Sequence, residues 1–335
     1  MVFLPFALLG LAALTQALQA VPKGFAPGVK WQIQIQSPMK ASGDLIPSDA
    51  IVWDIDLYNA AKNPDTIPQI RSKVPGAIIM CYFNAGLVQK WDCDYDSVWA
   101  KSGLTSTPHP DFPDERFIDV RKPKAVELIQ KRISLAQRIG CDAVDPDNID
   151  TYLYDQGEEN LTTFKLKKSD LSTFVKSLAT FAHGLKTTQG NTMLIGQKNA
   201  PELTPDLSPV LDFAVLEDCS GRNDPGNTAP FCKTFQDAYI GSGKPVFSIE
   251  YPKSIKTGRC SRVDDGDYKG TCGNVGDKGG FSTVLKIKGG DRELDGCTQY
   301  CDGKDTLVTG TNPDADGQCP ADAMKRRLMG RRARY

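Results

Sequence analysis

Short apolar segments rich in β-branched residues alternate along this chain with segments whose apolar residues have helical spacing. Eight such strand-like segments occur, at residues 51–56, 77–84, 117–121, 141–147, 193–198, 213–217, 245–250 and 282–287. Strands that alternate with helices form a parallel sheet with helical crossovers. A count of eight favours a closed barrel over an open sheet, and no GxGxxG phosphate-binding motif follows the first strand. We therefore predict an α/β protein with a TIM-like (β/α)8 barrel.

The unit around the fourth predicted strand shows the pattern most clearly. Apolar residues recur at helical spacing in residues 126–139, and Gly140 stands where a helix C-terminus favours glycine. A strand follows and runs into a cluster of acidic residues. Alternate residues of a strand share one face, so we expect Ala143, Asp145 and Asp147 to point the same way.

The charge of the chain is unevenly distributed. The formal net charge is −1, but basic residues are concentrated in residues 325–335, so the rest of the chain is acidic. An acidic body argues against nucleic acid as a partner. It suits a cationic ligand, although a solvated acidic surface is the commoner reason for such a balance.

Residues 1–20 carry no charge and contain an apolar run typical of a secretory signal peptide, although the usual basic start is missing. An uncleaved anchor is the alternative. No other stretch is apolar enough to span a membrane, so no span is expected in the mature form. We expect a secreted, extracellular protein, with attachment to a cell wall through the basic tail as a variant of that location.

The cysteine content agrees with an oxidising compartment. The chain has ten cysteines, an even number that favours disulfides in a secreted protein. Cys219 and Cys232 flank a polar loop and are expected to form one bridge. Cys81 and Cys141 lie within strand signals, where buried free thiols are at least as good an expectation as a bridge. Two further bridges are expected among the cysteines of the last quarter. The predicted domains are a signal peptide at 1–20, the barrel at 21–288, and a Cys-rich, loop-rich extension with a basic tail at 289–335.

Acidic residues end at least five of the eight predicted strands. In a (β/α)8 barrel the active site forms at the C-terminal ends of the strands. A single acid there has an alternative role next to a helix N-terminus, but five at one mouth indicate a site. The residues at the strand ends are Asp54 and Asp56, Tyr82 and Asn84, Asp119 and Arg121, Asp145 and Asp147, Lys198 and Asn199, Glu217 and Asp218, Glu250 and Tyr251, and Lys286 and Lys288.

A mouth of carboxylates can bind a divalent metal, perform acid–base catalysis or hold a cation. The acidic run at 145–150 lacks the glycine and glutamate of a calcium loop, and two histidines with no CxxC pair make zinc a poor fit. Magnesium at Asp54 and Asp56 is the metal alternative; we expect no metal or cofactor. Triads with histidine are poorly supported, which leaves hydrolysis by paired carboxylates, the scheme of most glycosidases.

Several motifs occur together and in a characteristic order. They are Trp31-Gln32-Ile33-Gln34, Asp54-Ile55-Asp56, Cys81-Tyr82-Phe83-Asn84-Ala85-Gly86, Phe117-Ile118-Asp119-Val120-Arg121, Asp142-Ala143-Val144-Asp145-Pro146-Asp147-Asn148-Ile149-Asp150-Thr151-Tyr152, Lys198-Asn199-Ala200, Glu217-Asp218-Cys219 and Lys244-Pro245-Val246-Phe247-Ser248-Ile249-Glu250-Tyr251. Over roughly residues 31–288 the chain resembles glycoside hydrolase family 114, the secreted endo-α-1,4-polygalactosaminidases. The resemblance does not cover the Cys-rich extension.

This resemblance implies a catalytic pair made of an Asp at the fourth strand and a Glu at the sixth. The Glu maps onto Glu217, the expected general acid and then base. For the Asp there are two candidates on one face: Asp147, at the tip, is our choice as nucleophile, and Asp145, one pleat deeper, would orient it or bind sugar. A retaining, endo-acting cleavage of α-1,4-linked galactosamine or N-acetylgalactosamine polymers is expected.

The remaining predicted site residues concern the substrate. Asp54, Asp56, Asp119 and Glu250 are expected to pair with ammonium groups of the polymer, and Trp53, Tyr82 and Tyr251 to stack on sugar faces. The full predicted substrate-binding set is Asp54, Asp56, Tyr82, Asp119, Asp145, Asn148, Asp150, Lys198, Glu250 and Tyr251. Two other readings are a non-catalytic barrel that binds a cationic polysaccharide and a structural wall protein. The sequence leaves the oligomeric state and the preferred acetylation state open.

Overall fold

The structure of the 335-residue chain is a computed structural model. It describes residues 21–156, 160–220, 231–255, 262–273, 279–288, 294–301, 307–308, 310–311 and 317–321. The predicted signal peptide at 1–20 and the basic tail at 325–335 lie outside the described residues. Within the described part, no helix combines the length and the apolar character needed to cross a membrane.

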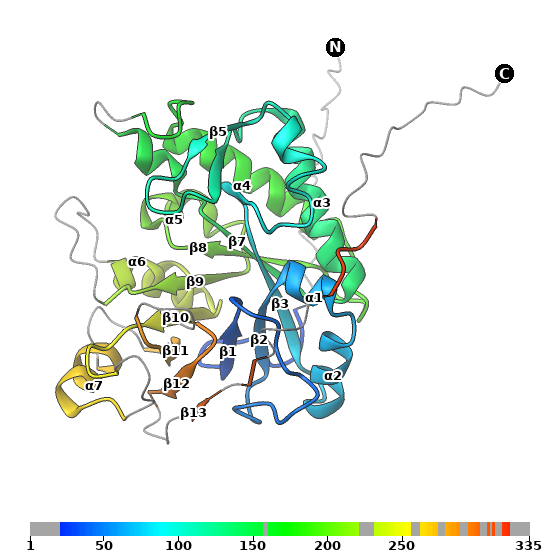
Figure 1. The fold of residues 1–335 in the computed structure, drawn as a ribbon. Helices are drawn as coiled ribbons and strands as arrows, with labels where there is room; N and C mark the ends of the chain where they lie inside the picture. Colours follow the sequence, from blue (N-terminus) through cyan, green and yellow to red (C-terminus); the bar gives the residue numbers. More distant parts are fainter. Residues whose placement is uncertain are drawn as a thin grey trace, which may run out of the picture.

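Eight parallel strands form the centre of the described part of the molecule, in the order β1-β2-β3-β7-β8-β9-β10-β11 (Figure 1). Two antiparallel strands, β12 and β13, extend the sheet beyond β11. This curled sheet with helical crossovers confirms the predicted TIM-like barrel. The strands are β1 Trp31–Gln34, β2 Val52–Asp56, β3 Ile78–Asn84, β7 Ala143–Asp147, β8 Leu194–Lys198, β9 Phe213–Glu217, β10 Val246–Glu250, β11 Ser282–Leu285, β12 Cys297–Tyr300 and β13 Leu307–Val308.

One barrel strand, β1, is missing from the eight predicted strands, although its residues alternate between apolar and polar. Gln32 and Gln34 interrupt its apolar run, yet both are buried. The Gln32 amide donates to the Ile46 carbonyl at 3.0 Å, and the Gln34 amide donates to the Gly310 carbonyl at 3.0 Å. A buried amide is tolerated when its hydrogen bonds are made, and the partners here are remote in sequence, so the pattern alone does not predict the burial of these amides.

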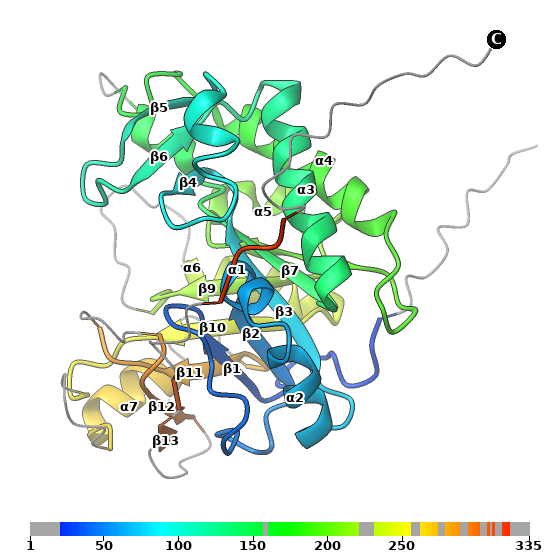
Figure 2. The ribbon, with the colours of Figure 1, turned by 45° about the vertical axis from the view of Figure 1, so that its right-hand side comes forward.

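The prediction of a barrel strand at residues 117–121 is wrong. Residues Glu115–Ile118 form β6, which pairs antiparallel with β4 (Leu87–Gln89) and β5 (Thr105–Pro108) in a separate three-stranded sheet. Figure 2 shows this small sheet above the barrel strands in that view. The alternating pattern of these residues fits any half-buried strand, parallel or antiparallel, so it could not tell the two sheets apart.

Side chains join the two ends of the parallel set, β1 and β11. The ammonium of Lys286, directly after β11, donates to the Ile33 carbonyl of β1 at 3.1 Å and to Gln32 Oε1 at 3.0 Å. The Tyr300 hydroxyl of β12 donates to the Trp31 carbonyl at 2.7 Å. These contacts bring the first and last strands of the barrel together.

The strands bury apolar side chains on both faces, as parallel strands between helices must. Inward residues such as Met80 and Val215 fill the barrel, and outward residues such as Ile79 and Leu216 pack against the helices. The helices are α1 Leu57–Lys62, α2 Thr66–Lys73, α3 Pro123–Ile139, α4 Lys168–His183, α5 Thr204–Leu207, α6 Phe231–Ala238 and α7 Asp265–Cys272, with short 3-10 helices η1 Trp99–Lys101, η2 Thr151–Asp155, η3 Pro201–Leu203 and η4 Ile240–Ser242. Gly140 ends α3 at φ 106°, a left-handed conformation that favours glycine.

Disulfides tie the extension to the barrel. The expected Cys219–Cys232 bridge is present, and Cys81–Cys141, for which free thiols were equally expected, is also a disulfide. Cys272 bonds to Cys301 within the last quarter. Cys319 instead bonds to Cys93, far from the last quarter. With β12 paired to β11, the described part of the extension continues the barrel sheet.

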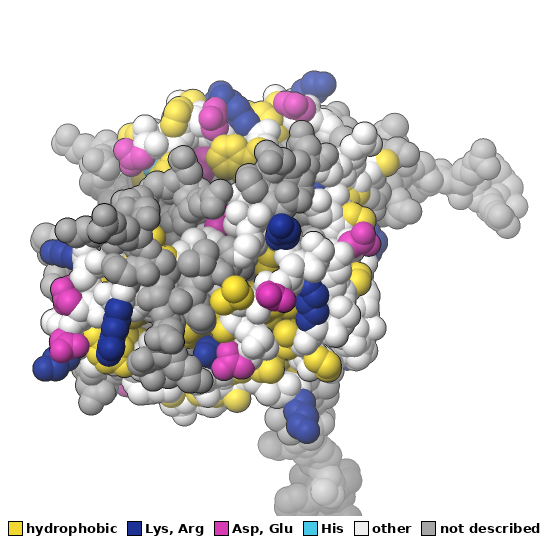
Figure 3. All heavy atoms as spheres, turned by 60° about the horizontal axis from the view of Figure 1, so that its bottom comes forward, with side chains coloured by type: hydrophobic (Ala, Val, Ile, Leu, Met, Phe, Trp, Pro, Cys, Tyr) yellow, Lys and Arg dark blue, Asp and Glu magenta, His cyan; other side chains and the backbone are white. Residues whose placement is uncertain are grey.

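The surface carries charges of both signs. On the face shown in Figure 3, the lysine and arginine side chains of the described residues are spread singly among acidic ones.

Candidate active site

The interior of the barrel changes from apolar to polar toward the C-terminal ends of its strands. On β7 the inward residues are Ala143, which belongs to the apolar interior, then Asp145 and Asp147. Lys198 and Glu217 end the next two strands, β8 and β9. Because the C-terminal ends of parallel strands meet at one mouth of a barrel, these side chains converge.

Asp147 is held by three contacts. Its Oδ2 accepts a hydrogen bond from the Tyr82 hydroxyl at 2.7 Å, its Oδ1 accepts one from the Asn148 backbone N–H at 2.7 Å, and the Lys198 ammonium lies 3.2 Å from Oδ1. Burial alone raises the pKa of this carboxyl, but the Lys198 charge and the hydrogen bonds outweigh burial and lower the pKa of Asp147. Its side chain is 18% exposed, so Asp147 is an ionised carboxylate that a ligand can reach.

Lys198 bridges the two predicted catalytic acids. Its ammonium lies 3.2 Å from Asp147 Oδ1 and 3.7 Å from Glu217 Oε2, and its side chain is 5% exposed. Burial lowers a lysine pKa, but the carboxylates of Asp147, Glu217 and Asp145 outweigh it and raise the pKa of Lys198. Since one nitrogen contacts both acids, the two carboxylate oxygens lie within about 7 Å of each other, close enough for a glycosidase pair.

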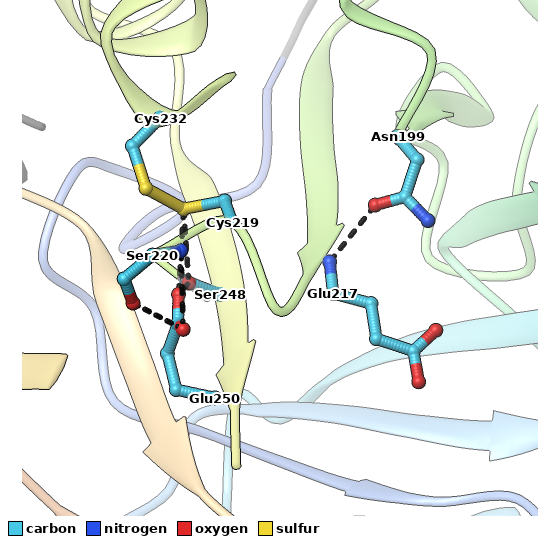
Figure 4. The surroundings of a disulfide bond; sticks show 7 residues. All are labelled: Asn199, Glu217, Cys219, Ser220, Cys232, Ser248 and Glu250. Atoms are coloured by element: carbon cyan, nitrogen blue, oxygen red, sulfur yellow. Dashed lines mark hydrogen bonds between the residues drawn. A yellow bond between two sulfur atoms is a disulfide. The ribbon is translucent and has the colours of Figure 1, made fainter. Parts of the chain in front are cut away.

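Glu217 is fixed by contacts at its backbone and its carboxylate. Its backbone N–H donates to Asn199 Oδ1 at 2.9 Å, and its Oε1 accepts a hydrogen bond from the Tyr251 hydroxyl at 2.5 Å. Figure 4 shows the Glu217 side chain pointing away from the neighbouring Cys219–Cys232 disulfide. The side chain is 31% exposed, which leaves the carboxyl open to the mouth.

The residue after each of three site residues has a left-handed backbone. Asn148 follows Asp147 with φ 56°, Asn199 follows Lys198 with φ 45°, and Asp218 follows Glu217 with φ 57°. Asn and Asp adopt this region at lower cost than other non-glycine residues, and left-handed residues cluster at functional sites. Sharp turns therefore follow β7, β8 and β9 immediately after the site residues.

Gly86 is required by one of these turns. A Cβ at Gly86 would lie 1.8 Å from the Asn148 carbonyl oxygen, closer than any real contact. The Ala85 and Gly86 backbone N–H groups donate to the Asp147 carbonyl at 2.9 and 3.2 Å. The segment after β3 thus holds the end of β7 in place.

Asp54 and Asp145 lie beneath this constellation. Both are buried, with relative exposures of 0%, and none of their four carboxylate oxygens has a hydrogen-bond partner among the described residues. Burial raises the pKa of Asp145 to about 7, although the Lys198 charge opposes it. Burial and repulsion by Asp145 raise the pKa of Asp54 well above its usual value. Neither carboxyl reaches solvent, unlike Asp147.

Three residues predicted to contact substrate face elsewhere. Asp56 caps α1 by accepting the Asn59 N–H at 2.7 Å. Trp53 is fully buried and packs on the helix side of the sheet. Glu250 is also fully buried and, on β10, lies between the inward Ile249 and Tyr251.

The surroundings of Glu250 explain its burial. Its carboxylate accepts hydrogen bonds from the Ser248 hydroxyl at 2.8 Å and from the Ser220 hydroxyl and backbone N–H (Figure 4). The Cys219 sulfur lies 3.3 Å from Glu250 Oε1 but has no hydrogen to donate because it belongs to a disulfide. For the same reason the cluster of Cys219, Cys232 and Glu250, whose ligand atoms lie within 4.8 Å of one another, offers no thiolate for a metal.

Asp119 and Asp150 lie at the starts of helical segments. Asp119 precedes α3, is 4% exposed, and forms a bidentate ion pair with Arg121 at 2.8 and 3.1 Å. The hydrogen bonds and charge of Arg121 overcome burial and lower the pKa of Asp119. Arg121 also lines a groove of about 460 Å³ between α3 and α4. Asp150 precedes η2 and is partly buried.

Glu115 is a site neighbour that the sequence pattern did not indicate. It lies on β6, accepts a hydrogen bond from the Gln89 amide at 2.6 Å, and interacts electrostatically with Asp147. Burial raises the pKa of Glu115 to about 7. Glu115 lies near Asp147 because β6 belongs to the separate three-stranded sheet and not to the barrel.

Comparisons with known proteins identify the family of this chain. The family model of glycoside hydrolase family GH114 matches residues 12–306. Among solved structures, Ega3 from Aspergillus fumigatus, in a complex with galactosamine, superposes with a TM-score of 0.68 at 29% identity, covering 85% of this chain and 99% of that chain.

A bacterial glycoside hydrolase shares the fold. The glycoside hydrolase domain of PelA from Pseudomonas aeruginosa superposes with a TM-score of 0.55 at 15% identity, covering 77% of this chain and 94% of that chain. A search of curated proteins found no match. Because the family model spans most of the chain, the protein belongs to glycoside hydrolase family GH114 and is a glycoside hydrolase.

Proposed function

We propose that this glycoside hydrolase is a secreted, endo-acting enzyme that cleaves α-1,4-linked galactosamine and N-acetylgalactosamine polymers with retention of configuration. The observation that carries the proposal is the pair Asp147 and Glu217, joined by the Lys198 ammonium at the barrel mouth. The galactosamine in the Ega3 complex supports the substrate class.

The pair has the properties of a nucleophile and a general acid. Asp147, ionised and 18% exposed, attacks the anomeric carbon while Glu217 protonates the departing glycosidic oxygen. Glu217 then removes a proton from the water that hydrolyses the glycosyl-enzyme. Retaining enzymes place their carboxyls about 5–5.5 Å apart and inverting enzymes about 6.5–9.5 Å. The contacts with Lys198 bring one oxygen of each carboxyl within about 7 Å of the other, which admits the retaining separation. The anomer of the first product tests retention.

Burial distinguishes the two candidate nucleophiles. Asp145 is fully buried, and burial raises its pKa to about 7. Asp147 is partly exposed and has a lowered pKa. A nucleophile must be ionised and must touch the sugar, so we assign Asp147 this role.

Charge and aromatic surface support a cationic sugar polymer. At the mouth, Asp147 and Glu217 flank the Lys198 cation, and Glu115 adds a further acid nearby. The ammonium of Lys288 lies 5.5 Å from the Tyr251 ring centroid but is ion-paired with Asp218. Tyr82 and Tyr251, each hydrogen-bonded to one of the two acids, place aromatic rings beside the reacting centre, where rings can stack on sugar faces.

Secretion is supported by the disulfides. Four bridges join described residues, at Cys81–Cys141, Cys93–Cys319, Cys219–Cys232 and Cys272–Cys301. Disulfides persist in oxidising compartments and are rare in the cytosol.

The direct test is reducing-end release from partly deacetylated α-1,4-galactosaminogalactan. We expect Asp147→Asn and Glu217→Gln each to reduce turnover by about 1,000-fold or more. Glu127→Gln, an exposed acid on α3 paired with Lys124 and Lys131, is the matched control and should behave like the wild type. Binding of the polymer by the wild type without release of reducing ends would overturn the proposal.

An aryl galactosaminide with an acidic phenol as leaving group separates the two roles. This leaving group needs no proton, so Glu217→Gln should still form the glycosyl-enzyme from it, whereas Asp147→Asn should not. An active Asp147→Asn beside an inactive Asp145→Asn would show that the nucleophile assignment is wrong. Proton NMR of the first product anomer tests retention, and initial formation of the β-anomer would exclude it.

A further inference from the structure

The two acids beneath the mouth, Asp54 and Asp145, have no structural role in hydrogen bonding. All four of their carboxylate oxygens are buried and lack partners among the described residues, although buried polar atoms are nearly always paired. Two unpaired carboxylates that repel each other in a barrel interior are costly. The cost falls when the pair holds a proton.

The titratable groups that interact with the pair come from five strands, and one of them is a cation. These groups are Asp56 on β2, Tyr82 on β3, Asp147 on β7, Lys198 on β8 and Glu217 on β9. The Lys198 ammonium contacts Asp147 and Glu217, the two acids above the pair. The site therefore has an excess of carboxylates around one positive charge, and a second cation in the mouth would be stabilised by an ionised pair.

We propose that Asp54 and Asp145 hold a proton in the free enzyme and release it when an ammonium group of the substrate enters the mouth above them. In this step one carboxyl O–H bond breaks, the proton passes to solvent, and the resulting carboxylate faces the incoming ammonium. The net charge of the site is unchanged. The inference rests on the proposed function, because it requires a cationic sugar as the ligand.

This coupling makes the pair a specificity determinant for the amino sugar over its acetylated form. Burial raises the pKa of each acid in the pair, to about 7 for Asp145, and repulsion by nearby carboxylates adds to this. An N-acetyl group is neutral and brings no charge to compensate an ionised pair, so the proton stays. Binding of galactosamine residues should then tighten as pH rises toward neutrality, whereas binding of N-acetylgalactosamine residues should not change with the state of the pair.

Isothermal titration calorimetry counts the protons. Glu217→Gln, which binds without turnover, is titrated with galactosamine oligomers at about pH 6, where the sugar amines and the pair are both protonated. The titration is repeated in buffers of small and large ionisation enthalpy, and the slope of binding enthalpy against buffer enthalpy gives the protons released. We expect about one proton for galactosamine oligomers and none for N-acetylated oligomers.

Matched variants identify the source of the proton. In the Glu217→Gln background, Asp54→Asn and Asp145→Asn should each abolish most of the release while the oligomer still binds. Glu115→Gln removes another nearby acid whose pKa is raised to about 7 by burial, and it should leave the proton count unchanged. A melting curve for each variant checks folding, and two isosteric replacements in the pair keep the test available if one variant fails to fold.

The possible failures separate the inference from the proposed function. Binding of the galactosamine oligomer with no proton released overturns the inference alone. A proton count that persists in both pair variants, or that disappears in Glu115→Gln, assigns the proton to another group and also overturns the inference. No binding of either oligomer would overturn the proposed function and the inference together.

Discussion

Two buried lysines end two strands of the same barrel, and their surroundings give them opposite acid–base properties. Lys198 lies at the mouth, between Asp147 and Glu217. Lys286 lies between β11 and β1, where its ammonium donates to the Ile33 and Leu294 carbonyls, Gln32 Oε1 and the Thr298 hydroxyl. Burial lowers the pKa of Lys286 to about 7, with a small opposing effect of Asp295, whereas nearby carboxylates raise the pKa of Lys198.

The difference shows that charged neighbours, and not burial itself, decide whether an interior lysine keeps its proton. Dipoles of carbonyl, amide and hydroxyl groups satisfy the hydrogen bonds of Lys286 but do not offset the full free-energy cost of desolvating its ammonium. Two close carboxylates do so for Lys198. Lys286 therefore contributes to the closure of the barrel. Lys198 balances the charge of the proposed catalytic pair, Asp147 and Glu217.

The largest effect is expected for Lys198→Met on activity. Without the ammonium, repulsion by the nearby acids and burial raise the pKa of Asp147, so the acidic limb of the kcat/KM profile should move to higher pH. We expect a loss of about 100-fold to 1,000-fold in kcat/KM at the wild-type optimum. Lys286→Met is the matched control and should keep the position of that limb. An unshifted limb in Lys198→Met would show that Lys198 does not set the ionisation of Asp147.

The second largest effect concerns how Lys286 changes stability with pH. Because the folded pKa of Lys286 is about 7 and the unfolded value is about 10.4, the unfolded chain binds more protons between these values. The free energy of unfolding should therefore rise with pH across this window, by up to about 1.4 kcal/mol per pH unit from this group.

Urea denaturation at intervals between pH 7 and pH 10 tests this slope. Lys286→Met should lack the contribution, whatever its absolute stability. Lys198→Met should retain the slope between pH 7 and pH 10. The pKa of Lys198 is raised in the folded protein, so this group changes stability with pH only above its unfolded pKa of about 10.4, where stability falls as the group deprotonates. Equal slopes in the wild type and Lys286→Met would contradict the comparison.

A smaller effect is expected for Tyr82→Phe, which measures how far the hydroxyl assists Lys198. Tyr82 donates to Asp147 Oδ2 at 2.7 Å, and a hydrogen bond to a charged group contributes about 1.5–3 kcal/mol. We expect a loss of about 10-fold in kcat/KM and a shift of the acidic limb in the same direction as in Lys198→Met, but smaller. Tyr251→Phe, which removes the hydroxyl bound to Glu217, should leave the acidic limb in place. A larger shift in Tyr82→Phe than in Lys198→Met would show that the hydroxyl lowers the pKa of Asp147 more than the ammonium does.

The smallest effect is expected for Asp295→Asn. The Asp295 charge raises the pKa of Lys286 against the effect of burial, so its removal should lower that pKa further. The pH at which stability begins to rise should then move below its wild-type value in the same urea series. A move in the other direction would show that Asp295 does not act on Lys286 through its charge.

The fold class and the place of the site could be predicted because the apolar strands end in polar residues. Asp145, Asp147 and Glu217 follow strong strand signals, and parallel strands bring their ends together whatever the details of the packing. The strand set could not be fixed in full. Buried Gln32 and Gln34 of β1 depend on partners remote in sequence, and β6 has the alternation of a barrel strand although it pairs in another sheet.

The alternation of side chains along a strand could predict part of which residues face the barrel interior. Glu250 and Tyr251 are adjacent on one strand, so both cannot face the barrel interior; the structure turns Tyr251 inward and buries Glu250 against Ser248 and Ser220. The same argument does not reach Asp56, because its role as the cap of α1 depends on where that helix begins. Nor does it reach Lys198, whose place between two acids depends on the register of three strands.

The Cys93–Cys319 bond makes most of the chain a covalent ring. The two residues are 226 positions apart, and the ring contains β5 through β13 together with Asp147, Lys198 and Glu217. A force that pulls on the two ends of the unfolded chain would pass across this bond, so the chain between Cys93 and Cys319 could not be extended until the bond broke. An exopeptidase that digests the C-terminal tail would leave the ring closed as long as it stopped before Cys319. The two proposed catalytic acids therefore lie inside the covalent ring, whereas Asp54 and Tyr82, which precede Cys93, lie outside it.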